Sequence, residues 1–204
     1  LSEGALPIAR ISELCQAFKM PAVGITDTNN MFGALEFSEK VSSVGVQPII
    51  GCNLKIKTPK NYLHENLEED DLHFFLNIFS KNEVGYKNLL NIISSAYMNH
   101  KENAYVDIEQ LYKNKEGLLV LSGGNNSILK YSNGNSITSQ SASFIADFKK
   151  EFIDNFYLEI QRIEGNDYRI DEEVILNLAY DNNIPVVATN DVYFEGPDHF
   201  EAHD

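Results

Sequence analysis

The chain has 204 residues, of which 43% are hydrophobic and 23% charged, a composition typical of a globular protein. Its 12 glycines, 6 prolines and 2 cysteines exclude a collagen-like chain, a disulfide scaffold and a wholly disordered chain. With 16 basic and 30 acidic residues the net charge is −14, so we do not expect this segment alone to grip the phosphate backbone of nucleic acid.

Apolar periodicity and the positions of proline and glycine predict alternating helices and strands along most of the chain. The first half reads as a helix over 7–18, a strand over 22–26, a helix over 32–44, a strand over 48–57, an acidic loop over 58–71, a strand over 72–79 and a helix over 85–99. The second half reads as a strand over 118–121, a polar connection over 125–140, a helix over 141–152, a strand over 156–162, a helix over 167–182, a strand over 185–189 and the start of a helix at 197–204.

Short, continuously apolar strands separated by helices indicate a parallel sheet buried on both faces and built from right-handed βαβ units. We therefore expect an α/β barrel or a closely related layered fold, with its chemistry at the carboxyl ends of the strands.

Three strand-end residues have the side chains of a metal-dependent phosphoesterase, namely Asp27, His73 and Asp191. Imidazole and carboxylate groups bind zinc or manganese, which activate water and polarise a phosphoryl oxygen. Three groups on separate strands are too few to establish such a centre, because an acidic protein of this size supplies some by chance. On the residues alone we favour an α/β domain without a metal centre.

The remaining motifs have simpler readings. His199 and His203 stand four residues apart, but the zincin pattern needs Glu directly after the first His, so we favour an ordinary helix face. Residues 122–125 (SGGN) follow a strand and suit either a phosphate cradle or a plain turn, and we favour the turn. Cys15 and Cys52 are not spaced for zinc and predict reduced thiols in a cytoplasmic protein.

No apolar run reaches the roughly 18 residues of a membrane span, and the first residues lack the pattern of a signal peptide. The chain begins without Met and stops at EAHD, so we expect a piece of a longer protein.

Five blocks of sequence, in order and over nearly the whole chain, resemble the N-terminal PHP domain of the bacterial replicative DNA polymerase III alpha subunits. They are MPAVGITDTNNMFGALEFSEKVSSVGVQPIIGCNLKI (20–56), HFFLNIFSKNEVGYKNLLNIISSAY (73–97), EGLLVLSGG (116–124), FYLEIQRIEG (156–165) and IPVVATNDVYFEGPDHFEAHD (184–204). The resemblance implies that residues 1–204 form an irregular (β/α)7-type PHP barrel, and that its opening strand and the polymerase palm and fingers lie outside the segment.

In members of this family with an intact centre, His, Asp and Glu ligands hold a cluster of metal ions at the barrel mouth. The first two ligands stand in an H-x-H upstream of Leu1. The matched positions in this chain are Glu3, Thr28, Asn53, His73, Ile163, Asp191 and Tyr193. Ile has no lone pair, Asn and Thr are weak neutral ligands, and Tyr ionises only near pH 10. The resemblance therefore implies a degenerate site without metal, in which His73 and Asp191 are the weak candidates for a residual ion.

The same resemblance implies a non-catalytic domain within a cytoplasmic DNA-directed DNA polymerase, a nucleotidyltransferase that uses Mg²⁺ in a later domain and contacts DNA through other domains. Its expected partners are the polymerase body of the same chain, a proofreading exonuclease subunit of the epsilon type and other holoenzyme subunits, with no membrane. No catalytic residue is expected in this segment. The alternative is a PHP-type phosphoesterase or 3′–5′ proofreading exonuclease with a reduced site around His73 and Asp191.

Overall fold

The computed structural model describes residues 4–62, 73–100, 103–124, 127, 129, 139–162 and 172–196. The helices in these ranges are α1 (Ile8–Ala17), α2 (Ala34–Ser43), α3 (Glu83–Asn99), α4 (Ile108–Lys113), α5 (Ser139–Phe152) and α6 (Glu172–Asp181), with short 3-10 turns at η1 (Lys60–Tyr62) and η5 (Ile153–Asn155). The strands are β1 (Ala22–Ile25), β2 (Gln47–Lys57), β3 (His73–Ser80), β4 (Leu118–Leu121), β5 (Phe156–Gln161) and β6 (Val186–Thr189). In that part of the chain, no helix has both the length and the apolar composition needed to cross a lipid bilayer.

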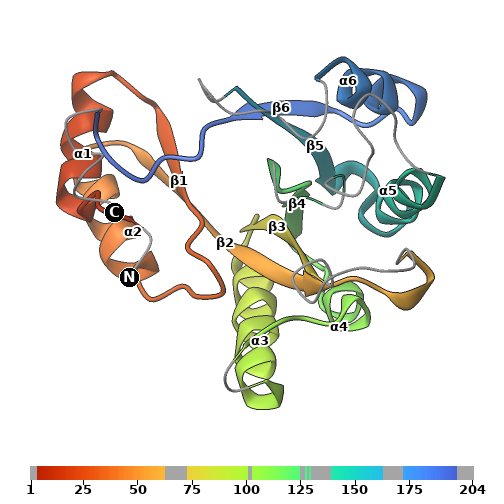
Figure 1. Cartoon of the computed structure of the whole chain (residues 1–204). Helices are drawn as coiled ribbons and strands as arrows, with labels where there is room; N and C mark the ends of the chain where they lie inside the picture. The colour runs from red at the N-terminus through yellow and green to blue at the C-terminus, as the bar shows by residue number, and fades with distance from the viewer. Residues whose placement is uncertain are drawn as a thin grey trace.

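The six strands form one curled sheet in the order of the sequence, β1-β2-β3-β4-β5-β6 (Figure 1). β1 pairs parallel with β2, β4 with β5, and β5 with β6, whereas β3 is antiparallel to both of its neighbours. Because β3 alone is reversed, its first residue, His73, pairs with Lys57 at the last position of β2. The reversal thus brings the start of β3 to the edge at which the other strands end.

The prediction of a fully parallel sheet was wrong at β3. A parallel connection needs a crossover, usually a helix, and the predicted elements place none between β2 and β3. The burial of β3 also alternates, because Phe74, Leu76 and Ile78 are buried while His73 and Asn77 are only half-buried. That period of two is typical of a strand that buries one face more deeply than the other.

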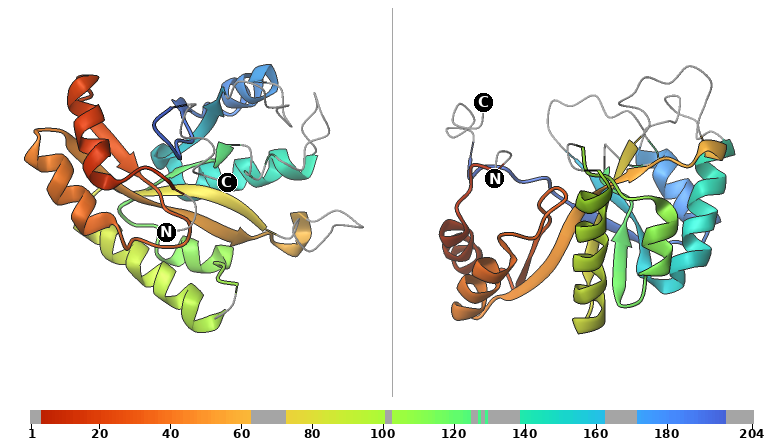
Figure 2. Two further views of the ribbon diagram at one scale, coloured as in Figure 1. Left: turned by 60° about the vertical axis from the view of Figure 1, so that its left-hand side comes forward. Right: turned by 90° about the horizontal axis from the view of Figure 1, so that it is seen from below.

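Two separate hydrophobic cores stabilise the fold. The small core contains Cys15, Phe37, Val41 and Val46, with half-buried side chains from α1, β1 and the start of β2 packed around them. The main core begins at Cys52 and gathers apolar side chains from β2–β5 and from α3–α6. Figure 2 (right) shows α1, α2 and β1 set apart from the remaining elements, joined to them by β2 and by the segment after β6.

Most predicted helices are present within the described ranges. α1 follows Pro7, and α3 begins after Asn82, whose side-chain oxygen accepts a hydrogen bond from the Gly85 N–H at 3.0 Å. α4 was missed because it has only six residues, although its Ile108 and Leu111 are buried. The expected helix at 197–204 and most of the 58–71 and 125–140 segments lie outside the described residues.

Burial of Cys52 predicts a loss of stability at alkaline pH. The side chain has 0% exposure, and desolvation raises the pKa of its thiol from 9.0 to about 12. The unfolded thiol ionises first, so stability present below pH 9.0 is lost as the pH rises toward about 12. At about pH 10 we expect the stability advantage of the wild type over Cys52→Ala to be about 1.4 kcal/mol smaller than at about pH 7. Denaturant unfolding of both proteins at the two pH values measures this difference, and a constant difference would contradict the prediction.

Candidate functional site

The turn after β1 lies directly against β2 and places two of the predicted positions side by side. Thr28 and Asn53 are partners in an isolated parallel β-bridge. The Asn29 N–H donates to the Asn53 carbonyl at 2.8 Å, and the Asn53 N–H donates to the Asp27 carbonyl at 3.1 Å. The backbone of this turn is therefore fixed by the middle of β2.

The side chain of Asn53 belongs to a chain of amide hydrogen bonds on the inner face of the sheet. Its Nδ2 donates to Oδ1 of Asn77, the residue opposite it on β3, at 2.9 Å. The Nδ2 of Asn77 in turn donates to both oxygens of Glu159 on β5, at 3.2 and 3.1 Å. Glu159 is only 2% exposed, so these contacts link three strands around a buried carboxyl group.

Three further neutral groups donate hydrogen bonds to the carboxyl group of Glu159. The Gly123 N–H donates to its Oε2 at 3.0 Å, and the Gln161 Nε2 donates to its Oε1 at 3.3 Å. The hydroxyl of Thr189 on β6 also donates to Oε1. We call Asn53, Asn77, Glu159, Gln161 and Thr189 the inner network. All the hydrogen bonds described to its carboxyl group come from amide or hydroxyl donors.

The loop after β4 is hydrogen-bonded to the inner network. The Glu159 N–H donates to the Ser122 hydroxyl at 2.9 Å, and the amide of Gly123 is directed at the Glu159 carboxyl group. A Cβ at Gly123 would lie 2.0 Å from the Phe75 carbonyl oxygen. A carboxyl group of the protein itself thus meets the backbone amide of the SGG turn.

His73 lies apart from the inner network, in an aromatic cluster at the edge of the sheet. Its ring centroid is 5.0 Å from that of Tyr105, and the His100 ring stacks on Tyr105 at 3.7 Å. The Nζ of Lys57 is 5.2 Å from the same ring. The two imidazoles thus share a tyrosine ring, and His100, at the C-terminal end of α3, is half-buried.

The last two matched positions lie in the segment after β6. Asp191 is exposed, and its Oδ2 accepts a hydrogen bond from the Tyr193 hydroxyl at 3.1 Å. The Tyr193 carbonyl accepts from the Ala5 N–H at 2.9 Å. Glu3 and Ile163 lie outside the described residues, as do His199 and His203.

The donors that the structure describes do not suit the multinuclear metal centre of the intact family. The Nδ2 of Asn53 donates to Asn77, so only its buried Oδ1, a neutral and weak ligand, is left to face an ion. Asp191 is hydrogen-bonded to a tyrosine where the family pattern has a histidine. Among the described residues, no group of three or more His, Cys, Asp and Glu side chains is placed to share one ion. We therefore derive no chemical step through a metal at this site.

Asn77 and Glu159, the central members of the inner network, were not predicted from the sequence. Each is a single polar residue in an otherwise apolar strand, and each stands out of phase with its buried apolar neighbours. A lone polar residue at alternate spacing in HFFLNIFS and FYLEIQ was the available signal.

Comparison with known proteins places this arrangement in a family. The sequence profile of the PHP domain matches residues 1–163. The chain belongs to the PHP domain family. A solved structure of an amidohydrolase from Chromobacterium violaceum, with bound sulfate and no metal, has a TM-score of 0.63 at 8% identity and matches 97% of this chain and 86% of that one. The curled sheet is accordingly that of a partial PHP-type barrel.

Curated relatives share the sequence over almost its whole length. The DNA polymerase III subunit alpha of Caulobacter vibrioides is 36% identical over 206 residues, which cover 100% of this chain and 18% of that protein. The subunit of the same name from Haemophilus influenzae is 30% identical over 203 residues, covering 99% of this PHP domain and 17% of the relative. The chain therefore spans less than one fifth of the length of these relatives.

Proposed function

We propose that this PHP domain is the N-terminal, non-catalytic domain of a replicative DNA polymerase III alpha subunit. In this role it packs against the polymerase body of the same chain and holds a proofreading exonuclease subunit of the epsilon type. DNA synthesis and the Mg²⁺ ions that support it belong to the polymerase domain, and contact with DNA to other domains and subunits. Three relatives that match at least 98% of the chain, each named as this subunit, support the proposal.

One observation carries the non-catalytic part of the proposal: the position matched to a ligand glutamate is Asn53, a neutral side chain whose Nδ2 donates to Asn77. A glutamate there would set a second carboxyl group close to Glu159, and bound cations would have to offset the repulsion between them. The inner network instead satisfies Glu159 with neutral donors. The chemistry of the inner face is thus that of a folded polar core.

The test is metal content and nuclease activity of the intact protein, purified without chelators. We expect well below one equivalent of zinc or manganese by elemental analysis, and no nuclease activity that EDTA abolishes. We also expect binding of the epsilon-type exonuclease, measured by co-elution, to be unchanged by EDTA, because docking needs no metal. One or more bound equivalents, together with chelator-sensitive turnover, would overturn the non-catalytic assignment.

The alternative is a PHP-type phosphoesterase or proofreading exonuclease that uses a reduced site. His73 and Asp191 keep ligand-type side chains, and this is the observation that favours it. In that case His73→Ala abolishes activity and leaves the fold intact, whereas Asn53→Ala, which keeps both His73 and Asp191, leaves turnover in place. Loss of EDTA-sensitive activity in the first variant alone would support the alternative.

A further inference from the structure

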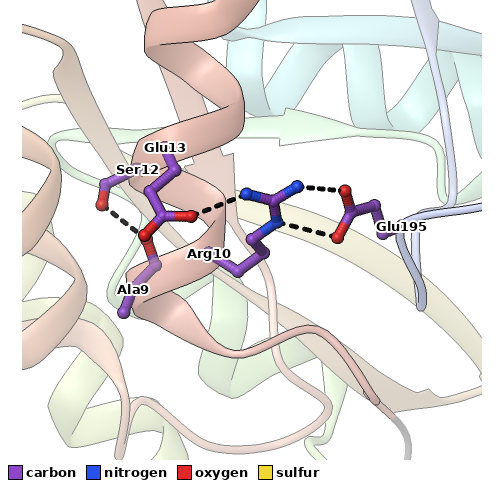
Figure 3. Close-up of polar contacts among 5 residues, drawn as sticks. All are labelled: Ala9, Arg10, Ser12, Glu13 and Glu195. Atoms are coloured by element: carbon purple, nitrogen blue, oxygen red, sulfur yellow. Dashed lines mark hydrogen bonds and ion pairs between the residues drawn. The ribbon is translucent and has the colours of Figure 1, made fainter.

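The first helix of the chain is fastened to the segment after β6 by contacts that span almost the full sequence. The Nε of Arg10 on α1 donates to the Glu195 carboxylate at 2.8 Å, and a second guanidinium nitrogen donates to the other carboxylate oxygen. Figure 3 shows this two-pronged pair, with Glu13 on the opposite side of the Arg10 guanidinium at 2.7 Å. The Ala5–Tyr193 backbone hydrogen bond lies between the same two segments.

Packing alone holds α1 weakly. Only Ser12 and Cys15 among its ten residues are buried, and Ile8 and Ile11 are half-buried against the small core. The main core contains no residue of α1. An element with few buried apolar contacts belongs to the low-stability end of a protein, where local opening occurs without global unfolding.

The opposite side of the small core is attached far more firmly. β2 runs continuously from the small core into the main core, and the turn after β1 is hydrogen-bonded to it at Asn53. Asn29 adds two links, accepting from the Lys55 N–H at 2.9 Å and donating to the Ala104 carbonyl at 2.9 Å. The described contacts of α1 to the second half of the chain, in contrast, are exposed polar ones.

We propose that α1 and residues 190–196 form a releasable clasp, in which the Arg10–Glu195 ion pair sets how often α1 leaves the small core. The clasp joins the first helix to the segment that carries Asp191 and Tyr193. A displacement of one of these two elements therefore moves the other. Release of α1 uncovers the side chains of the small core, beginning with Cys15. This inference does not depend on the proposed function.

The chemistry of the pair makes the clasp sensitive to salt. The side chains of Arg10 and Glu195 are 42% and 29% exposed, and ions screen exposed pairs. The hydrogen bond from Arg10 to Glu195, and to a smaller extent the one to Glu13, raise the pKa of the guanidinium above its ordinary value. Arg10 therefore stays charged at every working pH. Ionic strength is therefore a variable that opens the clasp.

The two cysteines provide internal probes, because Cys15 lies in the small core and Cys52 in the main core. In the intact protein, thiol labelling under native conditions should modify Cys15 about fivefold faster in Arg10→Gln and in Glu195→Gln than in the wild type. The double variant should label no faster than either single variant, because both remove one interaction. The labelling rate of Cys52 should stay unchanged throughout.

Two control variants isolate the clasp. Arg162→Gln breaks a similar pair, in which Arg162 donates to Glu172 at 2.7 Å through two nitrogens, but that pair lies within the second half of the chain. Glu13→Gln removes the local partner of Arg10 and keeps Glu195. Neither should change Cys15 labelling, whereas about 0.5 M salt should speed it in the wild type and not in Arg10→Gln.

Hydrogen exchange of the α1 amides provides a second measurement on the same proteins. Faster exchange in α1 with unchanged exchange in β3 would support the clasp. Unchanged Cys15 labelling and α1 exchange in both Arg10→Gln and Glu195→Gln would overturn the proposal. So would equal acceleration at Cys15 and Cys52, because that pattern reports global unfolding.

Discussion

Replacing Glu159 by Ala should destabilise the domain by about 3 to 5 kcal/mol, one of the two largest effects that we expect from a single substitution. The substitution relieves the desolvation penalty of a buried carboxyl group. It also leaves the donors of Asn77, Gly123, Gln161 and Thr189 without their acceptor in a site that is 2% exposed. Several buried unsatisfied donors outweigh one relieved penalty, so the net effect is a loss.

Denaturant unfolding measures this loss of stability, and two further variants serve as comparisons. Glu159→Gln keeps the shape and one acceptor but points an NH₂ group at existing donors, so we expect an intermediate cost of about 2 kcal/mol. Glu151→Ala removes a carboxylate that is 39% exposed and paired with Lys115, and should cost no more than about 1 kcal/mol. Equal losses of stability in Glu159→Ala and Glu151→Ala would show that the inner network stabilises the fold no more than an exposed ion pair does.

Replacing Gly123 by Ala should cost about 3 kcal/mol or more, and we expect this protein to unfold well below the wild-type temperature. Gly123 has φ +92°, which L-residues rarely adopt, and its added Cβ would lie 2.0 Å from the Phe75 carbonyl oxygen. That oxygen belongs to the backbone of β3 and cannot rotate away. The loop must shift, and the shift takes the Gly123 N–H away from Glu159.

Gly45 offers a matched control for the backbone part of this effect. It also has a positive φ, +79°, but a Cβ there would meet nothing within 4 Å. Gly45→Ala should therefore cost only about 1 kcal/mol, the strain of the left-handed conformation alone. Thermal unfolding of both variants separates strain from collision, and similar losses in the two would rule out the collision with Phe75.

Local patterns were enough to predict the strands, but not how the strands pair. The predicted strand at 118–121 coincides with β4, and the predicted strand at 22–26 differs from β1 by one residue. The direction of β3 depends on which neighbours it finds across the sheet, and a reading based on runs of apolar residues does not contain that information. α4 was not predicted because a helix of six residues is too short for its apolar period to be distinguished from chance.

The same reason explains why the inner network was missed. Asn53 was singled out only because the family has a ligand at that position, and nothing in the sequence around it names its partner. Asn53 meets Asn77 because β2 and β3 are antiparallel in one register, and a shift by one residue would turn one of them to the other face. Positions matched to family ligands could thus be predicted one by one, but the contacts that their side chains make could not.

The division into two cores has a consequence for the order in which the chain acquires structure. The small core draws on residues between Ile8 and Ile50, all of them close in sequence, whereas the main core begins at Cys52 and extends to Ile184. Contacts between near neighbours close with little loss of chain entropy and form early. During synthesis, the small core can therefore assemble as soon as its residues have left the ribosome, giving β2 a folded end from which the rest of the sheet is added strand by strand.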